Sequence, residues 1–493
     1  MNETVIVTEA APALPYSYAR RQGVLLRATA TGIECVHRAG VSLDAMLEVQ
    51  RVAPDAVFVA VADGDFDTAL SQVYSGNAAA ADLDLGDMDL AALADSAAAV
   101  DDLLDTRDDA PVIRLINALL LEAVKEGASD VHVETQEKRL VIRFRVDGVL
   151  RDMIEPPRAL APLLVSRIKV MAKLDIAEKR IPQDGRVTLR IGGHDVDARV
   201  STIPTQHGER VVMRLLEKGS MRLDLGVLGM SERDRIVFNR MLERPHGMLL
   251  VTGPTGSGKT TTLYAGLNSL NDRKRNIMTV EDPIEYELPG VAQTQVNART
   301  DMSFARGLRA ILRQDPDVIM VGEIRDQETA EVAVRSAMTG HFVLSTLHTN
   351  SAVGSVTRLI DMGVERYLLA PMVVGLVAQR LVRKLCPSCR AEDKATEGDA
   401  LLLGGAIKPG ETLWRPRGCP KCHNEGYRGR EGLYEVVAVD DAFQKRIHDG
   451  ASEAELEAAA RKTSPSLLDD GIAKVRAGLT TVEEVARVVR DEA

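Results

Sequence analysis

Residues 253–260, GPTGSGKT, have the composition and spacing of a loop that binds phosphate groups. They directly follow the apolar stretch MLLVT, residues 248–252, which predicts a buried strand. Glycines let backbone N–H groups curl around phosphate oxygens, and the helix that follows aims its N-terminus at them. We expect Lys259 to contact the β- and γ-phosphates of ATP and Thr260 to ligate Mg²⁺. The candidate nucleotide-binding residues are Gly253, Pro254, Thr255, Gly256, Ser257, Gly258, Lys259, Thr260 and Thr261.

A second candidate lies in PDVIMVGEIRDQET, residues 316–329. The apolar run 318–321 predicts a strand, and Glu323 is the first acid after it. A carboxylate at the carboxyl end of a strand, beside a phosphate site, can orient and activate the attacking water. We therefore interpret Glu323 as catalytic, with an acid stabilised by a helix dipole as the alternative. Gly322 stands where an Mg²⁺-holding Asp is usual.

Two further predicted strands end in polar residues. The sequence VEDPIE, residues 280–285, places Glu281, Asp282 and Glu285 together, at the edge where ligands bind in parallel sheets. Glu281 is nearest the strand and is the catalytic candidate, although which of the three acids acts stays open. The run 342–347 is followed by His348, whose neutral imidazole could sense a γ-phosphate; a structural histidine is the alternative.

Four of the five cysteines form two CxxC pairs with 29 residues between them: Cys386, Cys389, Cys419 and Cys422. Four thiolates at this spacing predict a tetrahedral structural Zn²⁺, which leaves no open position for catalysis. Disulfides are the alternative, but a cytosolic chain would keep its thiols reduced. The fifth, Cys35, is predicted to be an ordinary buried thiol.

The 493 residues are too many for one core, and their charge is unevenly placed. Residues 77–110 hold ten Asp and one Arg, whereas the rest of the chain has 60 basic and 62 acidic residues. We interpret 77–110 as an extended acidic linker, with a short amphipathic helix as the alternative. No apolar run approaches the roughly 18 residues of a spanning helix, and the start of the chain lacks a secretory pattern. A cytoplasmic location is the expectation.

The elements on either side of the linker predict the domains. Residues 1–76 form a small interaction domain without a chemical motif. A helix from about 110 to 127 and hairpins around residues 147–148 and 192–193 predict an α+β domain over 111–225. Short apolar runs separated by helices then predict α/β architecture with a parallel sheet over 226–493. This last domain includes the cysteine insertion 386–422 and a helical region 440–493.

Taken together, GPTGSGKT, VEDPIE, VGEIRD and TGHFVLSTLHTN resemble the motifs of the secretion ATPase superfamily over roughly residues 110–493. In that family the strand before the catalytic Glu ends without the usual Asp, as at Gly322. The resemblance implies a RecA-like P-loop core after a PAS-like α+β domain, and a homohexamer. It also implies that arginines of the α+β domain approach a neighbouring subunit's phosphates. Arg199 and Arg214 match that pattern best, Arg210 is a third candidate, and solvated strand charges are the alternative.

The four cysteines resemble the type II secretion and type IV pilus assembly branches, not the retraction branch. The stretch LPYSYARRQGVLL, residues 14–26, resembles the start of the type II secretion ATPases. That resemblance implies docking of residues 1–76 on the cytoplasmic domain of an inner-membrane platform protein, and a multipass platform protein as a further partner. The chain would then sit at the inner membrane as an indirectly attached peripheral protein.

Three other functions are alternatives to type II secretion. A type IV pilus assembly ATPase is the first alternative, since the four cysteines resemble both branches and only the stretch at residues 14–26 favours type II secretion. A DNA-translocating P-loop protein should offer basic grooves and stacking aromatics, but the chain has one Trp, seven Phe and eight Tyr, so no nucleic-acid partner is expected. A zinc scaffold that only binds ATP is disfavoured by Glu323 and the acids at 281–285.

Overall fold

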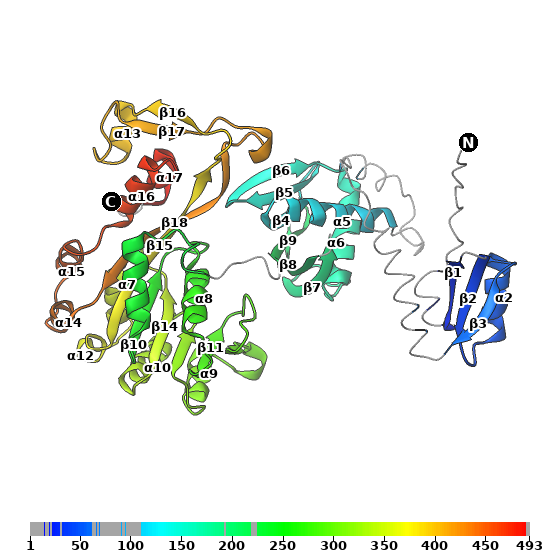
Figure 1. Ribbon diagram of the computed structural model, residues 1–493, viewed down its shortest axis with the longest axis horizontal. Helices are drawn as coiled ribbons and strands as arrows, with labels where there is room; N and C mark the ends of the chain where they lie inside the picture. The colour runs from blue at the N-terminus through cyan, green and yellow to red at the C-terminus, as the bar shows by residue number, and fades with distance from the viewer. Residues whose placement is uncertain are drawn as a thin grey trace, which may run out of the picture. The chain divides into compact units, whose positions relative to one another are not determined.

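The computed structural model describes residues 22–29, 32–61, 110–191, 194–217 and 224–489, with single positions 14, 19, 66, 69, 90 and 94. The chain divides into two compact units, Met1–Leu121 and Glu122–Ala493 (Figure 1). Apart from positions 90, 94 and 110, the predicted linker 77–110 lies outside the described residues. Among the described residues, no helix combines the length and apolar character that a membrane span requires.

The first unit contains a small sheet with a crossover helix. Strands β1 (Val24–Thr29) and β2 (Gly32–Arg38) pair antiparallel, and β3 (Val57–Val61) pairs parallel to β2. Helix α2 (Leu43–Val52) connects β2 to β3 and begins at Ser42, whose side chain caps it. Burial raises the pKa of the Cys35 thiol to about 11, and this residue is the buried thiol that the sequence predicts.

The α+β domain begins in the helix at 110–125, whose residues 110–121 belong to the first unit, and its sheet lies in the second unit. Helix α5 (Ala110–Lys125) leads to a six-stranded antiparallel sheet in the order β6-β5-β4-β9-β8-β7, and α6 (Ala161–Met171) lies between β6 and β7 in the chain. The strand bounds are β4 Ala128–Thr135, β5 Leu140–Val146, β6 Val149–Ile154, β7 Gln183–Ile191, β8 His194–Thr205 and β9 Gly208–Glu217. Both predicted hairpins are present, although the second turn itself, 192–193, lies outside the described residues.

One row of residues across this sheet is rich in arginine. The strand register places Arg186, Arg199, Arg214, Asp130 and Arg145 directly opposite one another on β7, β8, β9, β4 and β5. Residues directly opposite each other in an antiparallel pair lie on the same face of the sheet. The two candidate arginines therefore stand side by side.

The α/β domain predicted over 226–493 is built on a seven-stranded sheet in the order β12-β11-β13-β14-β10-β15-β18. All neighbours are parallel except β15 and β18. The strands are β10 Gly247–Thr252, β11 Ile277–Glu281, β12 Ala292–Gln295, β13 Val318–Val321, β14 Phe342–Leu347, β15 Val373–Leu385 and β18 Tyr427–Ala438. The four apolar runs of the sequence are β10, β11, β13 and β14, which confirms the predicted α/β fold.

Helices cover both faces of this sheet. Alternate residues of β10 enter different cores: Met248 and Leu250 lie in one, Leu249 and Val251 in the other. The helices are α7 Glu232–Leu242, α8 Lys259–Leu270, α9 Phe304–Ile311, α10 Gln327–Met338, α11 Gly354–Asp361 and α12 Arg366–Leu369. Because the sheet is covered on both faces, its central strands β10, β13 and β14 are buried at every residue.

Beyond β15 the chain forms the cysteine insertion and then returns along β18. The insertion contains β16 (Ala391–Lys394), α13 (Glu397–Leu402), β17 (Thr412–Arg415) and the short 3₁₀ turn η3 (Pro420–Cys422). The rest is helical, as expected: α14 Asp441–His448, α15 Glu453–Ala460, α16 Leu467–Arg476 and α17 Val482–Val489. These helices lie at the red end of the ribbon (Figure 1).

Candidate active site at the carboxyl ends of the sheet

The loop 253–260, called the P-loop below, connects β10 to α8. Its last glycine, Gly258, caps α8 in a left-handed conformation, φ 88°, which favours glycine. Gly253 also has a positive φ, and a Cβ there would lie 2.4 Å from the Gln379 carbonyl oxygen. Space and backbone angle therefore both require glycine. The first N–H groups of α8 point toward this loop, as a phosphate site needs.

Lys259 is buried at the start of α8. Its Nζ donates to the carbonyl oxygens of Gly253 and Pro254, at 2.7 and 3.0 Å. Burial lowers the Lys259 pKa to about 8; the carboxylate of Glu323 opposes this shift, and the guanidinium of Arg380 adds to it. An ammonium group that is desolvated in this way gains a favourable partner when an anion arrives.

Glu323 and His348 extend from neighbouring strands, β13 and β14. Their closest atoms, Glu323 Oε2 and His348 Nε2, are 3.4 Å apart, and Arg325 also forms an ion pair with Glu323. Burial lowers the His348 pKa; the charge of Lys259 adds to this shift, and Glu323 opposes it. The imidazole is therefore neutral near pH 7, and the structure brings three predicted residues, Lys259, Glu323 and His348, into one electrostatic group.

Glu281 has a different environment. It is 2% exposed, and its two carboxylate oxygens accept hydrogen bonds from three neighbours: Tyr264 Oη, Thr279 Oγ1 at 2.5 Å and Gln293 Nε2 at 3.0 Å. The Tyr264 hydroxyl also accepts the backbone N–H of Glu285 at 3.3 Å. With both oxygens engaged in the core, Glu281 holds the strand end in place more readily than it activates water.

The other two acids of this strand end face arginines. The pKa of Arg325 is raised, first by its hydrogen bond with Glu323 and further by the charge of Asp282. Glu285 Oε2 lies 3.0 Å from Arg199 Nη2, which also donates to the Ile284 carbonyl at 2.8 Å. Arg199 thus touches the loop 282–285 of its own chain.

The other candidate arginines are paired within the α+β domain. Arg214 Nε donates to Asp130 Oδ1 at 2.9 Å, and its side chain is 58% exposed. Arg210 lies 2.7 Å from Glu134 Oε1. Only Arg199 of the three has a contact with the α/β domain among the described interactions.

Two residues at this site carry no sequence motif. Arg380, in the interior of β15, is 4% exposed and donates to the carbonyl oxygens of Gln379 and Asn350, at 3.1 and 2.8 Å. It therefore connects the strand beside the P-loop to the turn after His348. Tyr264, on α8, is fully buried. A buried polar residue inside an apolar strand or helix was the available signal, although its partners cannot be read from the sequence.

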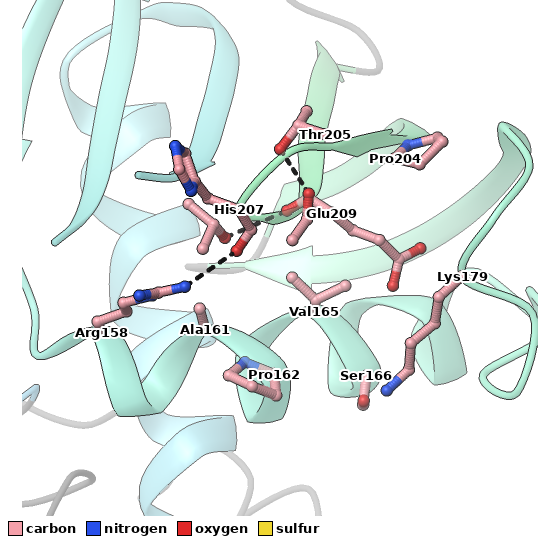
Figure 2. Close-up of a pocket in the computed structure, with 12 residues that line it drawn as sticks. Arg158, Ala161, Pro162, Val165, Ser166, Lys179, Pro204, Thr205, His207 and Glu209 are labelled. Atoms are coloured by element: carbon pink, nitrogen blue, oxygen red, sulfur yellow. Dashed lines mark hydrogen bonds between the residues drawn. The ribbon is translucent and has the colours of Figure 1, made fainter. Parts of the chain in front are cut away.

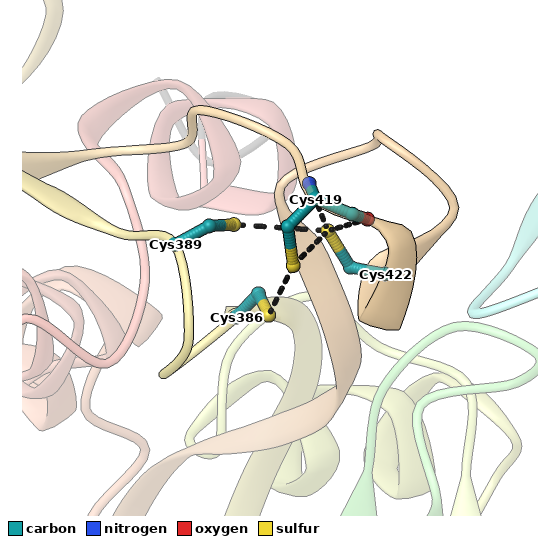
Figure 3. Close-up of side chains that lie close together, drawn as sticks. All are labelled: Cys386, Cys389, Cys419 and Cys422. Atoms are coloured by element: carbon teal, nitrogen blue, oxygen red, sulfur yellow. Dashed lines mark hydrogen bonds between the residues drawn. The ribbon is translucent and has the colours of Figure 1, made fainter.

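The four cysteines converge as predicted (Figure 3). All four Sγ atoms lie within 4.8 Å of one another, with separations of 3.9 Å for Cys386–Cys419 and 3.7 Å for both Cys389–Cys422 and Cys419–Cys422. A tetrahedron with Zn–S bonds of about 2.3 Å has S–S edges of about 3.8 Å. The cysteines are free thiols, so the set fits a structural zinc ion and not disulfides.

A hollow of about 240 Å³ lies elsewhere, between α6 and the β8–β9 turn (Figure 2). Its walls include Arg158, Lys179, His207 and Glu209. All its lining residues belong to the α+β domain, so it is separate from the P-loop.

A parallel sheet whose strand ends carry the P-loop lysine, a glutamate and a neutral histidine, preceded by an α+β domain, defines a P-loop ATPase of the secretion type. Comparison with known proteins agrees. Residues 105–487 match the family Type II/IV secretion system protein, and residues 13–74 match the family of N-terminal domains of GSPII protein E. The chain therefore belongs to the type II/IV secretion system family, in its type II E-protein branch.

Curated relatives match over nearly their whole length. The chain is 58% identical to Type II secretion system protein E of Pseudomonas aeruginosa, covering 99% of this chain and 98% of the relative. It is 54% identical to Type II secretion system ATPase E of Vibrio cholerae, covering 97% of each.

Solved structures share the fold. The pilus retraction motor PilT with bound ADP is 26% identical, with a TM-score of 0.53 over 76% of this chain and 96% of that chain. The ATPase DotB of Legionella pneumophila, 21% identical, has a TM-score of 0.57 over 77% and 95%. By family and fold, the chain is a secretion ATPase.

Proposed function

We propose that the chain hydrolyses ATP to ADP and phosphate at this site, and that the reaction powers type II protein secretion through pseudopilus assembly. The observation that carries the proposal is the grouping of Lys259, Glu323 and His348 at adjoining strand ends. The family match to type II E proteins supports the coupling to secretion.

In this proposal the β- and γ-phosphates lie against the N-terminus of α8 and the Lys259 ammonium. Water attacks the γ-phosphorus, its proton passes to the Glu323 carboxylate, and the bond between the γ-phosphorus and the bridging oxygen breaks to release ADP. His348, neutral and beside Glu323, can donate a hydrogen bond to a phosphate oxygen without an added charge. Glu281 holds the strand end of β11 through its buried hydrogen bonds.

Mg²⁺ fits this site as a cofactor. Thr260, half-buried in the first turn of α8, offers the hydroxyl ligand, and Mg²⁺ would supply neutralisation of phosphate charge when bound. Asp282 acts electrostatically on Arg325, the partner of Glu323, and its carboxylate is a candidate for a further oxygen ligand.

Arg199 is the proposed source of additional positive charge, and it acts within its own chain. It contacts Ile284 and Glu285, at the edge of the sheet that carries Glu323. An arginine that neutralises charge on the transferring phosphoryl group raises turnover by about 10³-fold or more. Arg214, next to Arg199 in the row, is the second candidate.

The four cysteines are proposed to hold one structural Zn²⁺ per chain.

The proposed assembly is a homohexamer on the cytoplasmic side of the inner membrane, with residues 1–76 docked on a platform protein. Deleting residues 1–76 should then leave basal ATPase activity intact and abolish recruitment to membranes that carry the platform. Loss of ATPase activity in a folded truncated protein would contradict this separation of roles.

Two variants test the active site. Lys259→Ala should abolish tight ATP binding, because the phosphates lose their paired cation. Glu323→Gln should bind ATP with near-normal affinity and lose turnover by at least about 10²-fold, since only the water-activating role is removed. Near-normal turnover by Glu323→Gln would overturn the assignment and make Glu281 the next candidate.

A further inference from the structure

The segment that leaves the last cysteine touches the α+β domain of the same chain. This segment, residues 423–430, is called the docking arm below. His423 Nε2 lies 3.0 Å from Glu126 Oε2, just after α5. Gly429 donates its backbone N–H to Asp147 Oδ2 at 2.8 Å, in the tight turn between β5 and β6. The docking arm therefore contacts two separate elements of that domain.

Longer-range ion pairs extend the same contact. Arg430 Nε lies 3.9 Å from Asp147 Oδ1, and Glu425 Oε1 lies 3.9 Å from Arg151 Nε on β6. Charges of opposite sign thus alternate between the two domains along the arm. The side chains of Asp147 and Glu126 are only 17% and 12% exposed, so their interactions are less screened than those of a surface pair.

The cysteine cluster fixes the shape of the docking arm. The backbone N–H of Gly426 donates to Cys422 Sγ at 3.2 Å. His423 and Asn424 are both left-handed, at φ 49° and 62°, which is an uncommon conformation for residues with a Cβ. Two consecutive residues keep such angles only where the surroundings impose them. Asn424 donates its backbone N–H to the Cys419 carbonyl oxygen at 2.9 Å, so the loop that carries Cys419 and Cys422 holds these angles.

We propose that the loop carrying the four cysteines, residues 386–422 and called the knuckle below, holds the two domains together. It shapes the docking arm so that the arm binds the β5–β6 turn and the end of α5, and this contact is called the dock below. This proposal rests on the proposed zinc site for the role of the metal, but not for the contact itself. The two domains also meet at Arg199, which contacts Ile284 and Glu285, and at Arg186, whose Nη2 donates to Gln295 Oε1 at 3.3 Å. If this interdomain contact is broken, Arg199 should lie at the active site in a smaller fraction of chains. The kcat should then fall, while the KM for ATP stays nearly unchanged.

The test uses full-length chains changed on the α+β side, away from the cysteines. Asp147→Gly keeps the left-handed turn, φ 50°, and removes the carboxylate that accepts from Gly429. Glu126→Gln removes the charge that faces His423. The matched control is Glu155→Ala, which breaks an ion pair of 2.7 Å with Arg139 inside the same domain. Metal content, hydrogen exchange of peptides covering 145–151 and 427–432, and ATPase kinetics are measured for each.

The Asp147→Gly chain should keep its metal, the amide hydrogens of its 427–432 peptide should exchange about tenfold faster, and its kcat should fall. The Glu155→Ala chain should match wild type in all three measurements. Removing metal from wild type with a chelator should speed exchange in the distant 145–151 peptide. If chelation changes exchange only within 386–426, or if Asp147→Gly and Glu126→Gln leave both the 427–432 peptide and kcat unchanged, the dock is rejected. Wild type purified without metal would contradict the zinc proposal alone, since the two variants still report on the contact.

Discussion

The Tyr264 hydroxyl donates to the buried carboxylate of Glu281, and this bond joins the P-loop helix to the end of β11. Tyr264 lies five residues after Lys259, on the same helix. Its hydroxyl also accepts the backbone N–H of Glu285, the residue that meets Arg199. The loop that receives Arg199 is therefore positioned by the helix that carries the phosphate-binding lysine.

Replacing this hydroxyl should impair turnover more than binding. Tyr264→Phe keeps the ring but removes the hydroxyl that donates to Glu281 and accepts from the Glu285 N–H. Leaving a buried polar group without its partner destabilises the fold by about 1–3 kcal/mol. We expect kcat to fall by about tenfold, with KM for ATP within about twofold, because Lys259 is untouched. Steady-state kinetics and thermal unfolding measure the two effects.

Tyr434→Phe is the matched control for Tyr264→Phe. Tyr434 is equally buried in the same core, and its hydroxyl donates to the Leu228 carbonyl at 3.1 Å. This variant should lose similar stability and keep its kcat. Equal losses of kcat in both variants would show that Tyr264 acts only through stability.

The lowered Lys259 pKa predicts a pH dependence of nucleotide affinity. Without nucleotide, Lys259 loses half its charge near pH 8. Phosphates favour the charged form, so binding raises this pKa and takes up a proton. Affinity should weaken as pH rises through 8, by about tenfold at pH 9. Calorimetry at constant Mg²⁺, in two buffers of different ionisation enthalpy, measures both the affinity and the proton. Constant affinity from pH 7.5 to 9.5 would contradict the assignment.

Subunit mixing distinguishes an arginine that serves the active site of its own chain (cis) from one that serves a neighbouring subunit's site (trans). Arg199→Ala should reduce kcat by about 10³-fold. When inactive Lys259→Ala chains are mixed with inactive Arg199→Ala chains, a cis arginine leaves every site incomplete, so no activity should return. Mixed assemblies are verified by capture through a tag on one variant. Partial recovery in such assemblies would show that Arg199 serves a neighbour's site, as the family resemblance implied.

Removing one thiol should release the metal without destroying the ATP site. Cys422→Ser is expected to lose the single zinc ion and to melt at a lower temperature, because structural zinc binding is coupled to folding. Cys35→Ser, in the first unit, should keep the metal. Metal analysis and nucleotide binding are measured on both. Unchanged zinc content in Cys422→Ser would exclude Cys422 as a ligand.

Much of the fold follows from local pattern. The runs that became β10, β11, β13 and β14 are continuously apolar, and each ends at a residue with evident chemistry. The sequence predicts β15 poorly because Gln379 and Arg380 interrupt its apolar pattern, although both are buried, at 2% and 4% exposure. Their burial depends on contacts with Thr262 and Asn350, which lie far away in the chain.

The roles of individual acids were equally hidden. Glu281, Asp282 and Glu285 are neighbours in sequence, but only the tertiary structure separates the buried Glu281 from Glu285, which faces Arg199. The same holds for Arg199 itself. The family resemblance made it a candidate, whereas the contact with its own chain depends on the packing of two domains.

Strand β15 has a mechanical consequence. Arg380 lies beside the P-loop, and Cys386 follows six residues later, about 20 Å along an extended strand. Its partner β18 runs antiparallel to it from Tyr427 to Ala438, so the paired strands form a rigid connection between the phosphate site and the knuckle. A small displacement of the P-loop end can therefore move the knuckle end without any loop having to transmit it.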